Sequence, residues 1–449
     1  MAVWSQIAYS EAITLNRMDA EYFRPENLAD LQRLKELRPQ PLCNFAFVTD
    51  GIHASPEIAP EGGVRYLSAK CVKDNAFALA DALSITDSQN AANKRTQLRP
   101  GDVLITSVGT IGNAAVVQPD ILPANADRHL GIVRLNQDAG LDPYYVASFL
   151  NSRYGRFQSI REATGNVQLN LFIEKIKTLL VPRLPVEKAV AEATQTAYAT
   201  RRKAEELYAE AEATLTATLG LDRVDLTPRL FYEDTYAHAA GAARFDAEYH
   251  SPRMQNVIKT LSTSGKTIGD VVTLMKRRFK AIPGKPFDYI EIADVSTAGT
   301  AGSSTVAGED APGRATWTVK PGDIITTTVR PIRRLSAIIL PEQDGFVCSS
   351  GFAVLRPRDI EPELLLTYLR LPLVAELLDL YTTASMYPAI STADLLRIPL
   401  QIPDERTRTT IASMVRVSLA ARAESISLLD EAKNMVENAI VPLQSHIQT

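Results

Sequence analysis

Three arginines stand at the end of a β-branched stretch in the segment "KPGDIITTTVRPIRR". Arg330, Arg333 and Arg334 would each present a planar guanidinium group, which donates paired hydrogen bonds to phosphate oxygens or to O6 and N7 of guanine. The alternative is an ordinary hairpin whose arginines are only hydrated. The same frame occurs earlier, as "RPGDVLITSVGTIGN", where small and polar residues replace the arginines: Gly109, Thr110, Gly112 and Asn113.

Other polar residues fall into groups that suit the same ligands. A basic run that encloses a Phe and a Pro-Gly turn could hold phosphates, although charge runs are commonly just hydrated surface. The run consists of Lys276, Arg277, Arg278, Lys280 and Lys285. Amides at alternate positions either suit adenine edges or serve local turns; these are Asn166, Gln168 and Asn170. For Lys94 and Arg95 a plain exposed loop is favoured over a phosphate contact, and Arg128 offers a weaker candidate contact.

The residue types that enzymes use do not form recognisable groups. The five histidines show no metal-binding spacing, and the chain has no G-x-x-x-x-G-K-[ST] phosphate loop. Its three cysteines are scattered, without a C-x-x-C pair. The run "LDPYY" partly matches an amino-methyltransferase motif, but a helix start with Pro143 in the first turn explains it better. We therefore expect a non-catalytic chain with no metal and no cofactor of its own.

The composition is that of an ordinary globular protein. The 449 residues include 45% hydrophobic and 22% charged residues, and 48 basic against 52 acidic residues give a net charge of −4. This balance argues against a protein that coats nucleic acid everywhere, but a locally basic face remains compatible with it. We read neither a signal peptide nor a membrane span, and we expect a cytoplasmic protein.

Four blocks of the chain occur twice and in the same order. "RMDAEYFRP", which starts at Arg17, returns as "RFDAEYHSP", which starts at Arg244. The Pro-Gly-Asp turn before the β-branched strand occurs at Pro100 and again at Pro321. "HLGIVRL" returns as "SSGFAVLRP", and "LLVPRLP" at Leu179 returns as "LRIPLQIP" at Leu396. Ordered matches whose offset drifts only slightly indicate an internal duplication with minor loop insertions.

Each repeat ends in a long helical segment with a 4-3 rhythm of small or apolar residues, which is typical of a coiled-coil seam. The first seam would consist of Val186, Val190, Ala193, Ala197, Thr200, Ala204, Leu207, Ala211, Thr214 and Thr218. The second would consist of Ile411, Val415, Leu419, Ile426, Leu429, Val436 and Ile440. The alternative is that each helix packs only on its own domain. If the seams pair, chain order requires the helices to be antiparallel.

The predicted fold class is α+β, with two duplicated β-rich domains separated by two long antiparallel coiled-coil helices in a pseudo-two-fold arrangement. We expect residues 1–185 to form the first β-rich domain and residues 186–220 the first helix. Residues 221–402 would form the second domain and residues 403–449 the second helix. Two similar units related by a dyad could read two half-sites on a DNA duplex.

The ordered, duplicated set of motifs resembles the specificity (S) subunits of type I restriction-modification systems, over essentially the whole chain. The resemblance rests on the G-D-[VI]-[LI] strand with its tip, on the block "TGNVQLNLFIEKIKTLLVPRLP", and on the alternation of two variable domains with two long helices. The segment "TTASMYPAIST" of the second copy departs from this pattern because it lacks the Gly-Asn-x-Gln run.

The resemblance implies a non-catalytic subunit whose two target-recognition domains read a bipartite sequence in double-stranded DNA. It also implies two modification (methyltransferase) subunits as partners, which bring S-adenosylmethionine, and restriction (nuclease-translocase) subunits for cleavage. The tips would then differ because the half-sites differ, with Gly109 and Gly112 allowing close backbone approach. The alternatives are an S-like DNA-binding adaptor of another anti-phage defence system and, from a different class, an enzyme with an unrecognised nuclease site.

Overall fold

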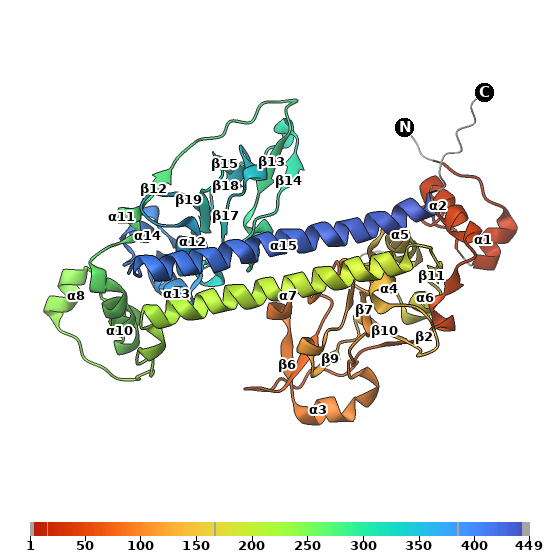
Figure 1. Cartoon of the computed structure of the whole chain (residues 1–449), viewed down its shortest axis with the longest axis horizontal. Helices are drawn as coiled ribbons and strands as arrows, with labels where there is room; N and C mark the ends of the chain where they lie inside the picture. Colours follow the sequence, from red (N-terminus) through yellow and green to blue (C-terminus); the bar gives the residue numbers. More distant parts are fainter. Residues whose placement is uncertain (1–3, 16, 166–167, 384–385, 442–449) are drawn as a thin grey trace. The chain divides into compact units, whose positions relative to one another are not determined.

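The computed structural model describes residues 4–15, 17–165, 168–383 and 386–441. The chain forms two compact units (Figure 1): unit 1 comprises residues 1–200 and 424–449, and unit 2 comprises residues 201–423. Two long helices, α7 (Glu187–Thr218) and α15 (Glu405–Ile440), are each shared between the units. Among the described helices, none combines the length and the apolar character that a membrane span requires.

Unit 1 is built from short strands and helices. Its strands are β1 (Gln40–Pro41), β2 (Ala46–Asp50), β3 (Val64–Leu67), β4 (Val72–Lys73), β5 (Ala76–Phe77), β6 (Leu83–Ile85), β7 (Val103–Thr106), β8 (Ala114–Val116), β9 (Ala124–Ala126), β10 (Leu130–Leu135) and β11 (Leu180–Val181). Its shorter helices are α1 (Tyr9–Leu15), α2 (Pro25–Glu36), α3 (Asp87–Ala92), α4 (Pro143–Asn151), α5 (Arg153–Glu162) and α6 (Ile173–Lys177). The main sheet is antiparallel in the order β2-β10-β7-β8, and a second sheet has the order β6-β3-β9 with β3 and β9 parallel.

Unit 2 repeats this plan. Its strands are β12 (Val272–Met275), β13 (Phe287–Ile290), β14 (Ser304–Val306), β15 (Ala315–Thr318), β16 (Ile324–Thr327), β17 (Ser336–Ile338), β18 (Val347–Ser349), β19 (Phe352–Pro357), β20 (Thr382–Thr383) and β21 (Ala389–Ile390). Its shorter helices are α8 (Tyr236–Ala242), α9 (Ala247–His250), α10 (Pro252–Leu261), α11 (Ile268–Val271), α12 (Pro362–Arg370), α13 (Pro372–Leu380) and α14 (Thr392–Arg397). The main sheet has the matching antiparallel order β12-β19-β16-β17, and the second sheet, β14-β13-β18-β15, again contains one parallel pair, β13 with β18. The predicted α+β class with two duplicated, sheet-rich parts is confirmed.

The β-branched run after each Pro-Gly-Asp turn becomes a central strand that is buried on both faces. Side chains alternate between the faces of a strand, so Ile105 of β7 lies in the core beneath α4 and α5, whereas Leu104 lies in a second core. In unit 2, Ile324 and Ile325 of β16 likewise lie in two different hydrophobic cores, one on each face of the strand. Because both faces are buried, the strand does not alternate between apolar and exposed polar residues.

The aspartate of each Pro-Gly-Asp turn fixes the entry to this strand. Asp102 accepts a hydrogen bond of 2.8 Å from the backbone N–H of Arg99, and it pairs at 2.6 Å with Arg134 of β10. In unit 2, Asp323 accepts at 2.8 Å from the N–H of Lys320 and pairs at 2.7 Å with Arg356 of β19. Both aspartates are buried, so each pair anchors the turn from which the next loop is projected.

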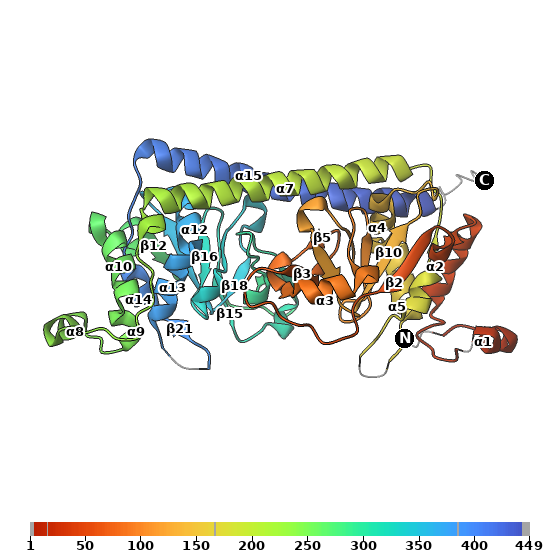
Figure 2. The same ribbon diagram turned by 90° about the horizontal axis from the view of Figure 1, so that it is seen from below.

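The halves of α7 and α15 pack against each other within each unit, as Figures 1 and 2 show. In unit 1, Ser425 donates a hydrogen bond of 2.8 Å to the carbonyl oxygen of Ala197, and Val190 shares the core with Ala432 and Val436. Residue numbers rise along one segment while they fall along the other, so the segments are antiparallel. In unit 2, Ser418 donates at 2.6 Å to the carbonyl oxygen of Ala204, and the order is again antiparallel.

Four of the ten residues predicted for the seam of α7 are fully buried. Val190, Ala197, Ala204 and Ala211 are fully buried, but the intervening positions are shifted by one residue, because Thr194, Tyr208 and Leu215 are buried where Ala193, Leu207 and Thr214 were predicted. On α15 the prediction of Ile426 is wrong, since its side chain is 58% exposed and Ser425 occupies the seam. The four-part domain division and the pseudo-two-fold relation stay predictions.

Candidate nucleic-acid interface

Two loops lie side by side at the end of the central strand in each unit. In unit 1, Val108 forms a β-bridge with Asn170, and the N–H of Leu171 donates to the carbonyl oxygen of Ser107 at 2.8 Å. We call residues 107–113 with the described part of 164–170 tip 1. In unit 2, Val329 forms the matching bridge with Ala389, and the N–H of Ile390 donates to the carbonyl oxygen of Thr328 at 2.9 Å. Residues 328–334 with the described part of 382–390 are tip 2.

The second loop of tip 2 therefore corresponds to the Gly-Asn-x-Gln loop of tip 1, although their sequences share no motif. The signal that could have revealed this is position, because the separation of Asn170 and Ala389 along the chain falls between the offsets of the two flanking repeated blocks. Backbone bridges set this geometry, so side-chain identity is free to differ between the copies.

Tip 1 exposes only part of its predicted residues. Gly109 and Thr110 are exposed, and Gly109 has a φ of +76° with open space where a Cβ would stand. Gln168 is exposed and Asn170 is half-buried, whereas Asn166 lies outside the described residues. Tip 1 thus brings Gly109, Thr110, Gln168 and Asn170 together, and a role for them in binding DNA stays a prediction.

Gly112 and Asn113 are directed into the protein, which corrects their predicted role. Gly112 has a φ of +83°, and a Cβ on it would lie 2.9 Å from Cβ of Ser159 on α5. The close approach that needs glycine is therefore to the protein's own helix. Asn113 is 8% exposed, its side chain donates to the carbonyl oxygen of Val72 at 3.3 Å, and its N–H donates to Oγ1 of Thr106 at 2.9 Å. These residues fasten tip 1 and do not face a ligand.

In tip 2, the side chain of Arg330 connects the two loops, and the residues that it contacts are exposed to solvent. Its guanidinium donates to the carbonyl oxygen of Met386 at 3.2 Å and lies 5.3 Å above the ring of Tyr387. Both Met386 and Tyr387 are exposed, at 76% and 67%. Arg333 is exposed too, and its side chain has no hydrogen bond or ion pair within the part of the chain that the structure describes. Tip 2 therefore presents two cations and an aromatic ring together.

Tyr387 was missed by sequence reasoning. Its ring can stack on a nucleobase, and the adjacent cation of Arg330 can share such a stack. The signal was an aromatic residue between Met and Pro at the position that matches the amide loop of the first copy.

Arg334 contacts the protein at the base of tip 2, but its side chain is 42% exposed, so a role in binding DNA stays a prediction. It has a φ of +56°, its guanidinium donates to the carbonyl oxygen of Arg370 at 3.4 Å, and it lies 4.0 Å from the carboxylate of Glu212 on α7. Burial raises the pKa of Glu212, and the neighbouring cations of Arg370 and Arg334 oppose that rise. Arg334 thus stabilises the base of tip 2 against α7.

The residues of the basic run at 276–285 also fall into two groups, one bound to the protein and one exposed. Arg277 is a second partner of the buried Asp323, so it holds the turn before β16, and its prediction as a phosphate-binding residue is wrong. Lys276, Lys280 and Lys285 are exposed, and the exposed Arg278 lies 5.7 Å above the ring of Trp317. For these four residues a phosphate contact stays a prediction.

The three weaker candidates lie on the surface of unit 1. Arg95 pairs at 3.3 Å with Asp50, and Lys94 is exposed beside it. Arg128 is exposed, and its N–H donates to the carbonyl oxygen of Ile52 at 3.1 Å. The carbonyl oxygen of His129, which follows Arg128, accepts at 3.0 Å from the N–H of Ser107 in tip 1. A DNA contact of the three candidates stays a prediction.

No family model and no curated protein matches the chain. Among solved structures, it is similar to the S subunit of the type I restriction-modification system from M. genitalium, at 12% identity and a TM-score of 0.38, with 89% of this chain and 94% of that chain covered. It is also similar to the HsdS subunit from Thermoanaerobacter tengcongensis, at 16% identity and a TM-score of 0.29 with the same coverages. A third structure, of complex assembly and conformational transition in the type I R-M system, matches at 17% identity and a TM-score of 0.27, covering 88% of this chain and 97% of that chain.

Proposed function

We propose that this protein is a non-catalytic DNA-recognition and scaffolding subunit of a type I restriction-modification complex. It reads a bipartite target in double-stranded DNA, with one tip for each half-site. The observation that carries the proposal is that the same two-loop tip is built twice, on matching strands, with different chemistry at its surface. A repeated frame gives both copies the same pose toward a ligand, and the changed surface gives each copy its own specificity.

The surface chemistry of the tips supports nucleic acid as the ligand. Arg330 and Arg333 of tip 2 suit guanine edges or phosphates, and Tyr387 suits stacking on an unpaired or distorted base. Tip 1 carries no arginine in its described loops, but Thr110, Gln168 and Asn170 supply donors and acceptors that suit an adenine edge. The two half-sites are therefore expected to differ in sequence.

A duplicated apolar surface supports two copies of one partner. We call residues 4–15 strap 1 and residues 230–243 strap 2. They contain α1 and α8, respectively (Figure 2). Trp4 and Tyr9 of strap 1 match Phe231 and Tyr236 of strap 2, and all four side chains are at least 75% exposed. Exposed aromatic side chains are typical of protein interfaces. We propose that each strap binds one modification subunit, that these subunits carry S-adenosylmethionine, and that restriction subunits join the complex for cleavage.

The test uses the complex assembled with its modification subunits. The target is first found by methylation-aware sequencing of a host that carries the system. Binding of the double variant Arg330→Ala and Arg333→Ala is then measured over a series of salt concentrations and over all base changes in both half-sites. We expect weaker binding, a salt slope reduced by about one for each lost phosphate contact, and relaxed preference in one half-site only.

The control is Arg202→Ala, which removes an exposed arginine of unit 2 that lies on α7 and pairs with Glu206. It should leave affinity and base preference unchanged. Unchanged affinity, salt slope and base preference in the tip variant would contradict the proposal. Stable co-purification with partners that do not bind S-adenosylmethionine would favour an adaptor of another defence system.

A further inference from the structure

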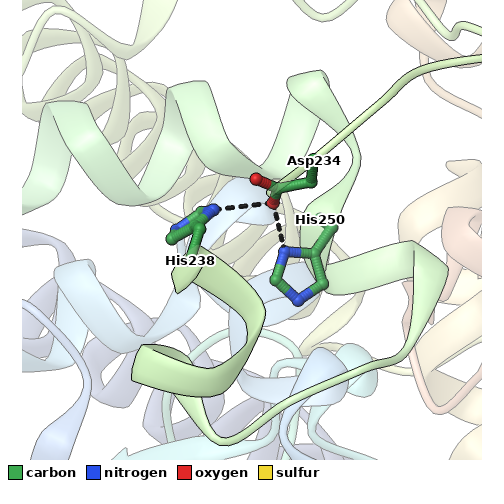
Figure 3. Close-up of side chains that lie close together, drawn as sticks. All are labelled: Asp234, His238 and His250. Carbon is green, nitrogen blue, oxygen red and sulfur yellow. Dashed lines mark hydrogen bonds and ion pairs between the residues drawn. The ribbon is translucent and has the colours of Figure 1, made fainter. Parts of the chain in front are cut away.

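Two histidines and an aspartate of unit 2 converge outside both tips (Figure 3). Nδ1 of His238 lies 2.6 Å from Oδ2 of Asp234, and Nδ1 of His250 lies 2.5 Å from the same oxygen. The sequence predicted no metal-binding group of histidines, because the spacing matches no known motif. The three residues meet through the fold of strap 2, which brings the start of α8 next to the end of α9.

Backbone groups orient two of these side chains. Nε2 of His250 lies 2.8 Å from the carbonyl oxygen of Arg244, so this nitrogen carries a proton. Nδ1 then either carries a second proton toward Asp234 or, when the ring is neutral, offers its lone pair to a cation. Oδ1 of Asp234 accepts at 2.7 Å from the N–H of Thr235, which leaves Oδ2 for the imidazoles. A backbone carbonyl that holds the second ring nitrogen is the usual support for a histidine that binds a metal.

The arrangement needs a positive charge between its three ligand atoms. A neutral imidazole lone pair at 2.5 Å from a carboxylate oxygen is repulsive unless a proton or a cation lies between them. Two imidazoles face one oxygen here, so one divalent cation could satisfy all three atoms together. His250 is buried, whereas the side chain of His238 is 45% exposed, which leaves one side open for a water ligand.

The first copy shows that the fold does not need these residues. In the alignment that pairs Arg17 with Arg244, Ile7 occupies the position of Asp234 and Phe23 that of His250. In unit 1, Ile7 packs against a small apolar cluster that includes Phe23. The neighbouring ion pair is kept in both copies, as Arg17 with Asp19 and as Arg244 with Asp246. Strap 1 is therefore held by an apolar contact, and in unit 2 metal-binding residue types replace that contact.

We propose that Asp234, His238 and His250 bind one zinc-type divalent cation, with water as the fourth ligand, and that this ion fastens strap 2 to unit 2. Two imidazole nitrogens and one carboxylate oxygen suit Zn²⁺, whereas Mg²⁺ and Ca²⁺ prefer oxygen ligands. Bonds of about 2.0–2.1 Å in a tetrahedron place ligand atoms roughly 3.3 Å apart. Binding therefore requires the distance to the carboxylate oxygen to lengthen by roughly 0.7 Å at the exposed His238 and by roughly 0.8 Å at His250.

The first test is calorimetric titration of Zn²⁺ into the full chain, purified without a histidine tag and stripped with a chelator. We expect one high-affinity equivalent per chain in the wild type. His238→Ala replaces an exposed ligand and should abolish this high-affinity Zn²⁺ binding. The matched variant combines Asp234→Ile with His250→Phe and so carries the residues of the first copy. This variant should fold, and it should also fail to bind the Zn²⁺ ion.

The second test follows strap 2 directly by limited proteolysis. If the ion fastens the strap, cleavage within residues 230–243 should slow in the wild type by about 100-fold at a Zn²⁺ concentration 100 times the Kd. Cleavage in strap 1 should not change. Equal Zn²⁺ binding by the wild type and both variants would overturn the proposal, as would binding that leaves strap 2 cleavage unchanged or a site filled by Mg²⁺ in preference to Zn²⁺. None of these outcomes depends on DNA binding, so the proposed function is tested separately.

Discussion

Arg333 and Arg334 are neighbours in the chain, but among the described residues only Arg334 has side-chain contacts with the protein. Arg333→Ala should weaken DNA binding by the assembled complex, by about 1–3 kcal/mol if the residue reads a base. Arg334→Ala should instead lower the free energy of unfolding, by about 1 kcal/mol, because its partly exposed contacts with Arg370 and Glu212 are lost. Salt-series binding and chemical denaturation of both variants separate the two roles. Equal effects of both changes on the salt slope would contradict this assignment.

Arg277 and Lys280 lie in one basic run and offer a second matched pair. Arg277→Ala removes one of two cationic partners of the buried Asp323, so we expect a loss of about 1–3 kcal/mol in the free energy of unfolding. Lys280→Ala changes an exposed side chain and should leave stability unchanged. If the run contacts phosphate, Lys280→Ala should also reduce the salt slope of DNA binding by about one. A stable Arg277→Ala protein would show that Arg356 suffices for Asp323.

His250 gives strap 2 a pH dependence whose sign depends on the metal. The hydrogen bond to the carbonyl oxygen of Arg244, together with the carboxylate of Asp234, raises the pKa of His250 above 6.5. In metal-free protein its contribution to stability is therefore full below about pH 6.5 and is lost as the pH rises through the folded-state value. A bound Zn²⁺ requires unprotonated imidazoles, so its contribution grows as the pH rises. The ionisable groups that act on His250 are Asp234, His238, Asp246 and Tyr249, and the backbone carbonyl of Arg244 holds its other ring nitrogen.

These opposite trends are measured as the rate of proteolysis in strap 2 from about pH 5.5 to about pH 8, with chelator and with Zn²⁺. The variant with Asp234→Ile and His250→Phe should show neither trend once the protease's own pH dependence is subtracted. The same trend with chelator and with Zn²⁺ would show that protons alone occupy the site.

The pairing of α7 with α15 depends on small residues at the contact. Ala197→Leu should cost about 1–3 kcal/mol or more, because a larger side chain would separate the helices and remove the 2.8 Å hydrogen bond from Ser425. Ser425→Ala leaves the carbonyl of Ala197 with its helical hydrogen bond and should cost only about 1 kcal/mol. Ala199→Leu on the exposed face of α7 is the control and should be close to neutral. Denaturation of the three variants checks this order of costs.

The same helices show what an apolar pattern can predict. Val190 and Ala197 were predicted correctly, but Thr194 was missed because the predicted seam was one residue out of register there. Ser418 and Ser425 were overlooked because only apolar residues were chosen on α15. The hydroxyls of these three residues are satisfied by hydrogen bonds to backbone carbonyls, at 2.7, 2.6 and 2.8 Å, so they are buried without an unpaired group. A search for apolar residues alone therefore chose Ile426, which is exposed.

The frame of each tip was predictable from the sequence, but the direction of its side chains was not. The Pro-Gly-Asp turn, the buried strand and the loop are local features with their own residue signals. Asn113 turns inward because Val72 of β4 accepts its hydrogen bond, and Arg334 is partly covered because Glu212 of α7 lies beside it. Such contacts are set by tertiary packing, which residue type and spacing near the tip do not encode.

At the scale of the whole molecule, the two units share the same arrangement of strands and anchoring contacts but differ in their surface residues. The order of the main sheet, the buried aspartate–arginine pair and the bridge between the tip loops are the same in both units. The differences lie in the tips, where Arg330 replaces Gly109, and in the straps, where His250 replaces Phe23. A common frame lets each surface change without loss of the core, as the proposed reading of two unlike half-sites requires.

The paired helices should set the number of unspecified base pairs between the half-sites. Seven residues inserted after Thr200 in α7, with seven inserted after Ala423 in α15, would leave every contact within each unit in place. One heptad keeps the seam on the same face and adds about 10 Å, or roughly three base pairs at about 3.4 Å each. We expect the methylated target to keep both half-sites and to lengthen its spacer by about three base pairs, as read by methylation-aware sequencing. An insertion in α7 alone is the control: it would move Ala197 away from Ser425 or Ala204 away from Ser418, and it should destabilise the protein without defining a new spacer. A stable double-insertion protein that still methylates the original spacing would show that the helices do not act as a ruler.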